Sequence, residues 1–157
     1  LFTQMLTGLS GVIDKAQAHC EAKKIDPNAI LTARLFPDMF HFIRQVQIAS
    51  DTAKGGMARL AGIEIPSFAD TETSFADLKA RIAKTLDFIA SVPQAKIDGA
   101  EDRDITVAMR AGPVQYKGLA YLQTSVLPNF YFHVTTAYAI LRSSGVEVGK
   151  QDFLGSV

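Results

Sequence analysis

The sequence predicts an all-α protein, an antiparallel four-helix bundle with a small β-hairpin between its third and fourth helices. Apolar side chains recur every three or four residues over four long segments, as on the buried face of a helix. In one short segment, residues 105–116, they alternate with other side chains, as in a strand. A chain of 157 residues fits one domain with a sizeable core, so we expect a single bundle over residues 1–157.

The first two helices are expected at residues 2–24 and 37–61. Asp26 and Pro27 end the first helix and can cap a short new turn. Pro37 is placed to open the second helix, because proline is favoured in a first helical turn.

Two adjacent glycines, Gly55 and Gly56, lie inside the second predicted helix. Each should cost about 1 kcal/mol relative to alanine. Close approach of a neighbouring helix would compensate for this cost, and a kink in the helix is the alternative. The sequence leaves both interpretations open.

The third helix is expected at residues 73–91, after a connection that contains Gly62 and Pro66. Thr73 or Ser74 can cap its start. Its charged residues lie off the apolar stripe and are expected to face solvent: Lys79, Arg81, Lys84 and Asp87.

The hairpin at residues 105–116 and the fourth helix at residues 118–143 complete the predicted bundle. A two-stranded hairpin is marginal alone, so it should lie against the helices. Pro128 interrupts the fourth helix, and Gly145 follows its end as a C-terminal glycine.

Composition and charge exclude several classes of function. The chain has sixteen acidic and sixteen basic residues, so no charge excess draws it to nucleic acid or to an anionic membrane. No apolar run approaches the roughly 20 residues that span a bilayer. A single cysteine, Cys20, excludes an intrachain disulfide and predicts a reducing, cytoplasmic location. Cys20 continues the apolar stripe of the first helix, so we expect it to be buried and structural.

The candidate site is on the fourth helix, where Asn129 and His133 lie four residues apart and share a face. In one interpretation His133 ligates a metal or polarises a substrate, and Asn129 adds a neutral oxygen or a donor. In the other, the two side chains form a buried hydrogen-bonded pair that fixes packing and binds no ligand. Pro128, just before them, removes a backbone donor, which opens a pocket or only starts a new helical segment.

A second histidine, His41, lies near the start of the second predicted helix. It shares a face with Asp38 and Gln45, three residues before it and four after it. A boundary or surface histidine is the simpler interpretation of His41, and a contribution to the site around His133 is the functional one.

Several motifs along the chain can be compared with known families. They are LFPDMF at 35–40, RQV at 44–46, ARLAG at 58–62, PNFYFH at 128–133 and GKQDFLG at 149–155. Together they resemble a bacterial family of uncharacterised proteins that is classed with the DinB/YfiT-like metalloenzymes. The resemblance covers nearly the whole chain.

This resemblance implies a four-helix bundle, often dimeric, whose metal-binding members use a histidine on helix two and a His-x-x-x-His pair on helix four. The pair falls on Asn129 and His133, so this chain has asparagine at the first position, and His41 is the histidine available on helix two. The implied metal set is therefore His133, His41 and Asn129. Asparagine oxygen is a weaker ligand than imidazole for zinc or nickel, so the metal is either retained or lost here, leaving a polar pocket.

Two classes of function follow. The first is an enzyme or remnant enzyme with a metal-binding or polar pocket around His133 and Asn129 for a small molecule. The resemblance implies thiol-linked transferase or hydrolase chemistry for that class. The second is a non-catalytic binding or structural protein with an architectural His–Asn pair. Balanced charge, a positive mean hydropathy and the resemblance all favour a homodimer.

Overall fold

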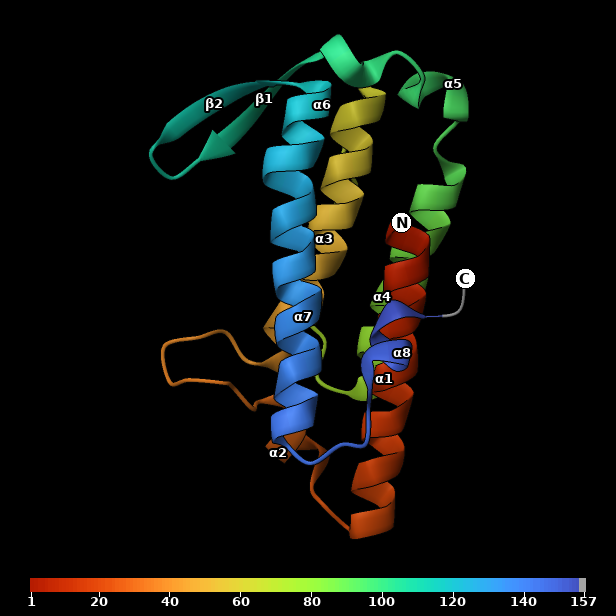
Figure 1. The fold of residues 1–157 in the computed structure, drawn as a ribbon, viewed down its shortest axis with the longest axis vertical. Coiled ribbons are helices and arrows are strands. Elements are labelled where there is room, and N and C mark those ends of the chain that lie inside the picture. The colour runs from red at the N-terminus through yellow and green to blue at the C-terminus, as the bar shows by residue number, and fades with distance from the viewer. Residues whose placement is uncertain (156–157) are drawn as a thin grey trace.

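The computed structural model describes residues 1–155 and shows a mostly helical chain with one small antiparallel sheet (Figure 1). The elements in chain order are α1 (Phe2–Lys23), α2 (Pro27–Leu31), α3 (Phe42–Ala61), α4 (Phe75–Ser91), α5 (Gln94–Ile97), the 3₁₀ turn η1 (Ala100–Asp102), β1 (Asp104–Met109), β2 (Gly112–Lys117), α6 (Gly118–Tyr121), the π-helical turn η2 (Leu122–Val126), α7 (Leu127–Ser143) and α8 (Lys150–Leu154). The predicted predominance of helix and the predicted hairpin are confirmed. Within these residues no helix has the length and apolar character needed to cross a membrane.

Four long helices, α1, α3, α4 and α7, surround the hydrophobic core. Helix α3 contacts α4 and α7, and α1 contacts the same two helices. Fully buried side chains come from all four, among them Leu6, Phe42, Leu78 and Phe130. The rings of Phe2 on α1 and Phe130 on α7 meet edge to face, with centroids 5.0 Å apart. The core is therefore shared by the four long helices, and the hairpin projects at one end of them (Figure 1).

The neighbouring helices α3 and α4 run in the same direction. Gln47 bonds Glu72 just before α4, and further along α3 Asp51 pairs with Arg81 inside α4. This is possible because residues 62–74 lead from the end of α3 back to the level of its start. The prediction of a strictly antiparallel bundle did not include such a return connection, and the structure differs from it at this pair of helices.

Helix α3 begins five residues later than predicted. His41 has an extended backbone, and its Nδ1 accepts a hydrogen bond from the N–H of Arg44 at 3.3 Å, which caps the helix. Pro37 instead occupies the second position of a turn, closed by a hydrogen bond from the N–H of Met39 to the carbonyl of Phe36. The prediction that Pro37 opens the helix is therefore wrong.

The close-approach interpretation is confirmed at one of the two glycines of α3. A Cβ at Gly56 would lie 2.6 Å from Cγ1 of Val126, in the π-helical turn η2. A Cβ at Gly55 would meet only the end of the flexible Arg59 side chain. Gly56 thus lets α3 and the helical path of α7 come together beside the candidate site.

Residues 118–143 follow one nearly continuous helical path, as predicted, but its middle is a π-helical turn. Pro128 lies in the first turn of α7, directly after η2. A proline ring clashes with the carbonyl four residues earlier, and a wider π turn there relieves that clash. Gly145, with φ of 82°, ends α7 as the predicted C-terminal glycine.

The hairpin pairs Asp104 with Lys117 at one end and Met109 with Gly112 at the turn. Its inward-facing side chains, which include Ile105, join the buried core. The hairpin is therefore held against the helices on one face, as a two-stranded ribbon requires.

Candidate functional site

His133 is buried between α7 and α3. Its Nδ1 lies 2.7 Å from Oε1 of Gln45, and the two side chains are 7% and 1% exposed. The Nε2 of Gln45 donates to the carbonyl of Phe40 at 3.0 Å, which orients the amide with Oε1 toward the imidazole. Because Oε1 can only accept, Nδ1 of His133 carries the proton and Nε2 is the free acceptor of the neutral ring.

The surroundings of His133 favour this neutral form. Burial, together with the positive charge of Arg44, lowers the pKa of His133 below its ordinary value. The ring of Phe132 lies edge-on to the imidazole, with centroids 5.2 Å apart. A neutral, partly enclosed imidazole with Nε2 available can accept a hydrogen bond or ligate a cation.

Asn129 lies one turn before His133 on α7 but has a different partner on α3. Its Nδ2 donates to Oγ1 of Thr52 at 2.8 Å. Within residues 1–155, no hydrogen bond joins Asn129 directly to His133. The predicted His–Asn pair is therefore replaced by two parallel contacts, each of which ties α7 to α3.

His41 caps the start of α3, and within residues 1–155 it makes no hydrogen bond with His133. Its Nδ1 is occupied as the cap of the helix, and burial with nearby Arg34 and Arg44 lowers its pKa. The α3 side chain that meets His133 is Gln45, one turn further along. Sequence reasoning placed Gln45 on the same face as His41 but did not identify it as the partner.

The three residues of the predicted metal set, His133, His41 and Asn129, thus have separate partners in the structure. In the described part of the chain, no three His, Cys, Asp or Glu side chains are grouped so that they could hold a metal ion. On this face, the atoms that could ligate a cation are the Nε2 of His133 and neutral amide oxygens. That donor set fits zinc or nickel poorly, because both favour several imidazole or thiolate ligands.

Beside this site lies an ionic network around a buried arginine, which was not predicted from the sequence. Arg81 of α4 was predicted to face solvent, but it is only 3% exposed. Its guanidinium pairs with Asp51 at 2.9 Å, Asp70 at 3.1 Å and Glu72 at 2.8 Å. Although burial opposes it, the hydrogen bonds from Arg81 and Gln47 hold the pKa of Glu72 below its usual value. The network fastens the 62–74 connection to α3 and α4.

The ring of Phe68 in the same connection is covered by cations. The Nζ of Lys54 lies 3.8 Å from the ring centroid and that of Lys84 lies 4.2 Å from it. The sequence carries a weak signal for the Arg81 network: Asp70 and Glu72 lie shortly before the start of α4, eleven and nine residues before Arg81.

Exposed apolar side chains lie on the outer surface of α7 and on the 32–41 connection, which joins α2 to α3. We call this set the aromatic face; its members are between 37% and 64% exposed and comprise Leu35, Phe36, Phe40, Tyr131 and Phe132. Leu35, Tyr131 and Phe132 line one shallow cleft of about 380 Å³. The 32–41 connection projects from the bundle near α7 (Figure 1). Exposed apolar side chains gathered in this way are typical of a protein interface.

Comparison with known proteins agrees with the motifs. The sequence model of a family described as a domain of unknown function (DUF1993) matches residues 1–154. The fold is similar to the crystal structure of a DinB family member protein from Shewanella denitrificans, with a TM-score of 0.92 and 43% identity. That match covers 99% of this chain and 88% of the other. A search of curated proteins found no match.

Proposed function

Because the chain belongs to the DUF1993 family, within the DinB-like superfamily, we propose that it is a non-catalytic homodimeric protein that acts by binding. In this proposal His133 and Asn129 are architectural. The observation that carries it is that both side chains bond residues of α3, at 2.7 Å to Gln45 and at 2.8 Å to Thr52. Each side chain thus has a partner within the fold, so the packing of α7 against α3 accounts for both residues without a ligand.

The proposed dimer uses the aromatic face, and the occupant of that face is a second copy of the chain. In a two-fold dimer the same patch meets itself, so one cluster of apolar side chains supplies both halves of the interface. The chain carries sixteen acidic and sixteen basic residues, so two copies do not repel each other through net charge. A reducing, cytoplasmic location fits the single cysteine and belongs to the same proposal.

Light scattering at tens of micromolar protein tests this proposal. We expect a dimer mass for the native chain and a monomer mass for Phe132→Asp, which places a charge on the aromatic face. Leu119→Asp is the matched control, because Leu119 is also exposed but lies on α6. A monomer mass for the native protein, or equal masses for the two variants, would overturn the proposed interface.

A second candidate function is a polar or metal site around His133, Asn129 and His41, in an enzyme or a remnant enzyme for a small molecule. The observation that favours it is the neutral His133 imidazole, whose Nδ1 is fixed by Gln45 so that Nε2 remains for a ligand. An imidazole held in this way through its other nitrogen is also the usual arrangement of a metal-ligating histidine. Zinc or nickel titration of protein purified without a nickel column distinguishes this candidate from the architectural one.

A further inference from the structure

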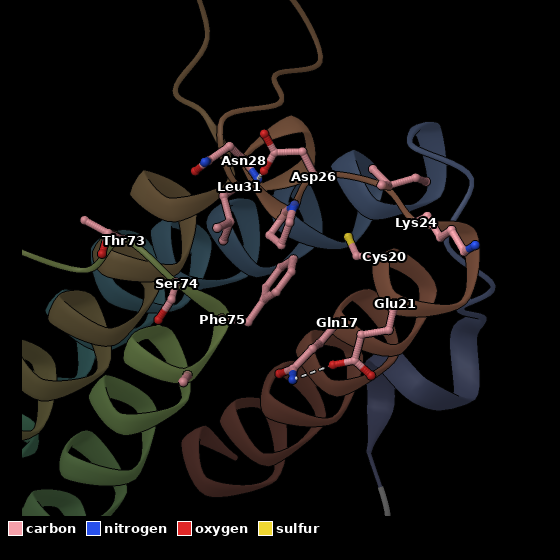
Figure 2. A pocket seen from close by; sticks show the side chains of 13 residues that line it. Gln17, Cys20, Glu21, Lys24, Asp26, Asn28, Leu31, Thr73, Ser74 and Phe75 are labelled. Atoms are coloured by element: carbon pink, nitrogen blue, oxygen red, sulfur yellow. Dashed lines mark hydrogen bonds between the residues drawn. The ribbon is translucent and has the colours of Figure 1, made fainter.

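A cleft at the opposite side of the bundle from His133 has features of a small-molecule site. It lies between the end of α1, the short helix α2 and the start of α4, and has a volume of about 550 Å³ (Figure 2). Small-molecule sites in proteins are clefts of about 300–1,000 Å³ with a mainly apolar lining. None of the residues assigned above to His133, to the ionic network or to the aromatic face lines this cleft.

The wall of the cleft is apolar. Leu31 and Phe75 are almost fully buried side chains that border it, and Cys20 is 3% exposed, as predicted for the apolar stripe of α1. Figure 2 shows Cys20 of α1 and Phe75 of α4 on two sides of the cleft that they line. The thiol is free, and within residues 1–155 the structure gives it no hydrogen-bond partner. An apolar ligand body would cover this surface.

The rim of the cleft is acidic beside the thiol. Glu21 extends from α1, and Asp26 caps α2 through the N–H of Asn28 at 2.9 Å, which leaves its other oxygen free. Burial raises the pKa of Cys20, and the negative charges of Asp26 and Glu21 raise it further. The two carboxylates therefore set a negative potential at the wall of the cleft, although Lys24 is also at the rim. A cation is favoured there and an anion is not.

We propose that this cleft binds a small amphipathic monocation, an amine with an apolar body, whose body covers Cys20 and Phe75 and whose ammonium group lies at the rim that Glu21 and Asp26 make acidic. Because the site uses neither His133 nor the aromatic face, it is independent of the function proposed above.

The probe for this proposal is phenethylamine, with phenylacetate and 2-phenylethanol as anionic and neutral analogues of the same ring. We expect phenethylamine to shift the backbone amide signals of residues 17–28 and 73–76 with a Kd of about 1 mM, as for a ligand of this size. The neutral analogue should bind more weakly and the anion most weakly. Phenethylamine should also slow the reaction of N-ethylmaleimide with Cys20, the one cysteine of the chain.

Two sets of variants separate the effect of the rim charge on phenethylamine binding from the effect of the space in the cleft. Glu21→Gln/Asp26→Asn removes the acidic rim and keeps a residue that can cap α2, and it should weaken phenethylamine binding about fivefold. Glu101→Gln/Asp87→Asn makes the same charge change at exposed positions elsewhere and should leave binding unchanged. Ala76→Trp at the cleft should abolish binding, whereas Ala83→Trp, exposed on the same helix, should not.

Equal affinity for phenethylamine and phenylacetate would overturn the proposal, and so would shifts that survive Ala76→Trp. The absence of shifts with all three probes would overturn it as well. Each variant is first compared with the native protein by its amide spectrum, so that loss of fold is not read as loss of binding. The double charge variant changes exposed side chains only, and it keeps the test decisive if Ala76→Trp does not fold.

Discussion

The Nδ1 of His133 lies 2.7 Å from Oε1 of Gln45, in a contact that joins the middle of α7 to the first turn of α3. The carbonyl of Phe40 fixes the other end of the glutamine amide, so a chain of two hydrogen bonds links α7, α3 and the backbone just before α3. Inside a protein such a chain specifies one packing of the two helices, because each partner would be left unsatisfied in any other.

Removal of Gln45 should destabilise the protein. Gln45→Ala leaves the buried Nδ1–H of His133 without an acceptor, which costs about 1–3 kcal/mol of unfolding free energy, in addition to the cavity. In Gln45→Leu/His133→Leu both polar partners are replaced, so its loss should be smaller than the summed losses of the single variants Gln45→Leu and His133→Leu, which complete the cycle with the native protein. Urea unfolding of the four proteins measures the coupling. A coupling energy near zero would show that the contact does not hold α7 against α3.

Stability should fall as the pH falls below about 6.5, the ordinary pKa of histidine. The pKa of His133 and that of His41 are both lowered in the folded protein, so the unfolded chain takes up protons first. Stability is therefore complete above the unfolded pKa and decreases as pH falls toward the folded pKa. Urea unfolding between pH 7.5 and 5 measures this slope, in the range set by histidine.

Two variants divide that pH dependence between the histidines. His133→Gln removes one titrating group and should flatten the slope, and His41→Asn removes the other and keeps a residue able to cap α3. A slope that both variants leave unchanged would contradict the assignment to these two groups.

Arg81→Met should be one of the most destabilising single changes on α4. It leaves the mostly buried Glu72 without its guanidinium partner, and breaking a buried pair in this way costs about 3–5 kcal/mol. Asp51 keeps its ion pair with Lys54. Lys79→Met is the matched control, because Lys79 pairs with Asp14 at the surface of the same helix and should lose about 1 kcal/mol or less. Similar losses in the two variants would mean that the Arg81 network behaves as a surface pair.

The two adjacent glycines should respond oppositely to alanine. Gly56→Ala forces a methyl group against Val126 and should cost about 1–3 kcal/mol. Gly55→Ala meets only the end of Arg59 and should be neutral or stabilise the helix by up to about 1 kcal/mol. Val126→Ala should rescue part of the Gly56→Ala loss, as thermal unfolding would show. A loss at Gly56 that is independent of Val126 would point to a cause other than close approach.

The sequence predicted the parts of this fold that depend on local pattern. The apolar repeats located the long helices, the alternation located the hairpin, and the stripe of α1 placed Cys20 in the interior. The sequence did not predict that residues 62–74 return along α3, because the apolar pattern of a helix does not determine its direction relative to a neighbouring helix. Arg81 was misassigned for the same reason, since its acidic partners become neighbours only after that return.

The contacts of the candidate site were not predictable from the sequence. The spacing of Asn129 and His133 predicted that they share a face of α7, and the structure packs that face against α3. Which α3 residues face them depends on where α3 begins. The later start at Phe42 makes His41 the cap and brings Gln45 to the imidazole.

The last prediction tests whether the helix geometry of a metal site remains. Asn129→His would restore a His-x-x-x-His pair on α7, one turn apart, and an imidazole there can turn from Thr52 toward the free Nε2 of His133. The native protein should bind zinc or nickel weakly, and the variant more than tenfold more tightly, which is a gain of about 1.4 kcal/mol or more. Isothermal calorimetry on protein purified without a nickel column measures both affinities.

The gain in metal affinity should require His133. A variant of His41 tests whether its imidazole also binds the metal. Asn129→His/His133→Ala should bind no better than the native chain, because one imidazole alone is a weak site. Asn129→His/His41→Asn keeps the cap of α3 and reports whether the third imidazole reaches the metal. If Asn129→His binds zinc no better than the native protein, the side chains of α3 and α7 do not converge on a cation. The contacts with Gln45 and Thr52 are then sufficient to explain why His133 and Asn129 occupy this interface.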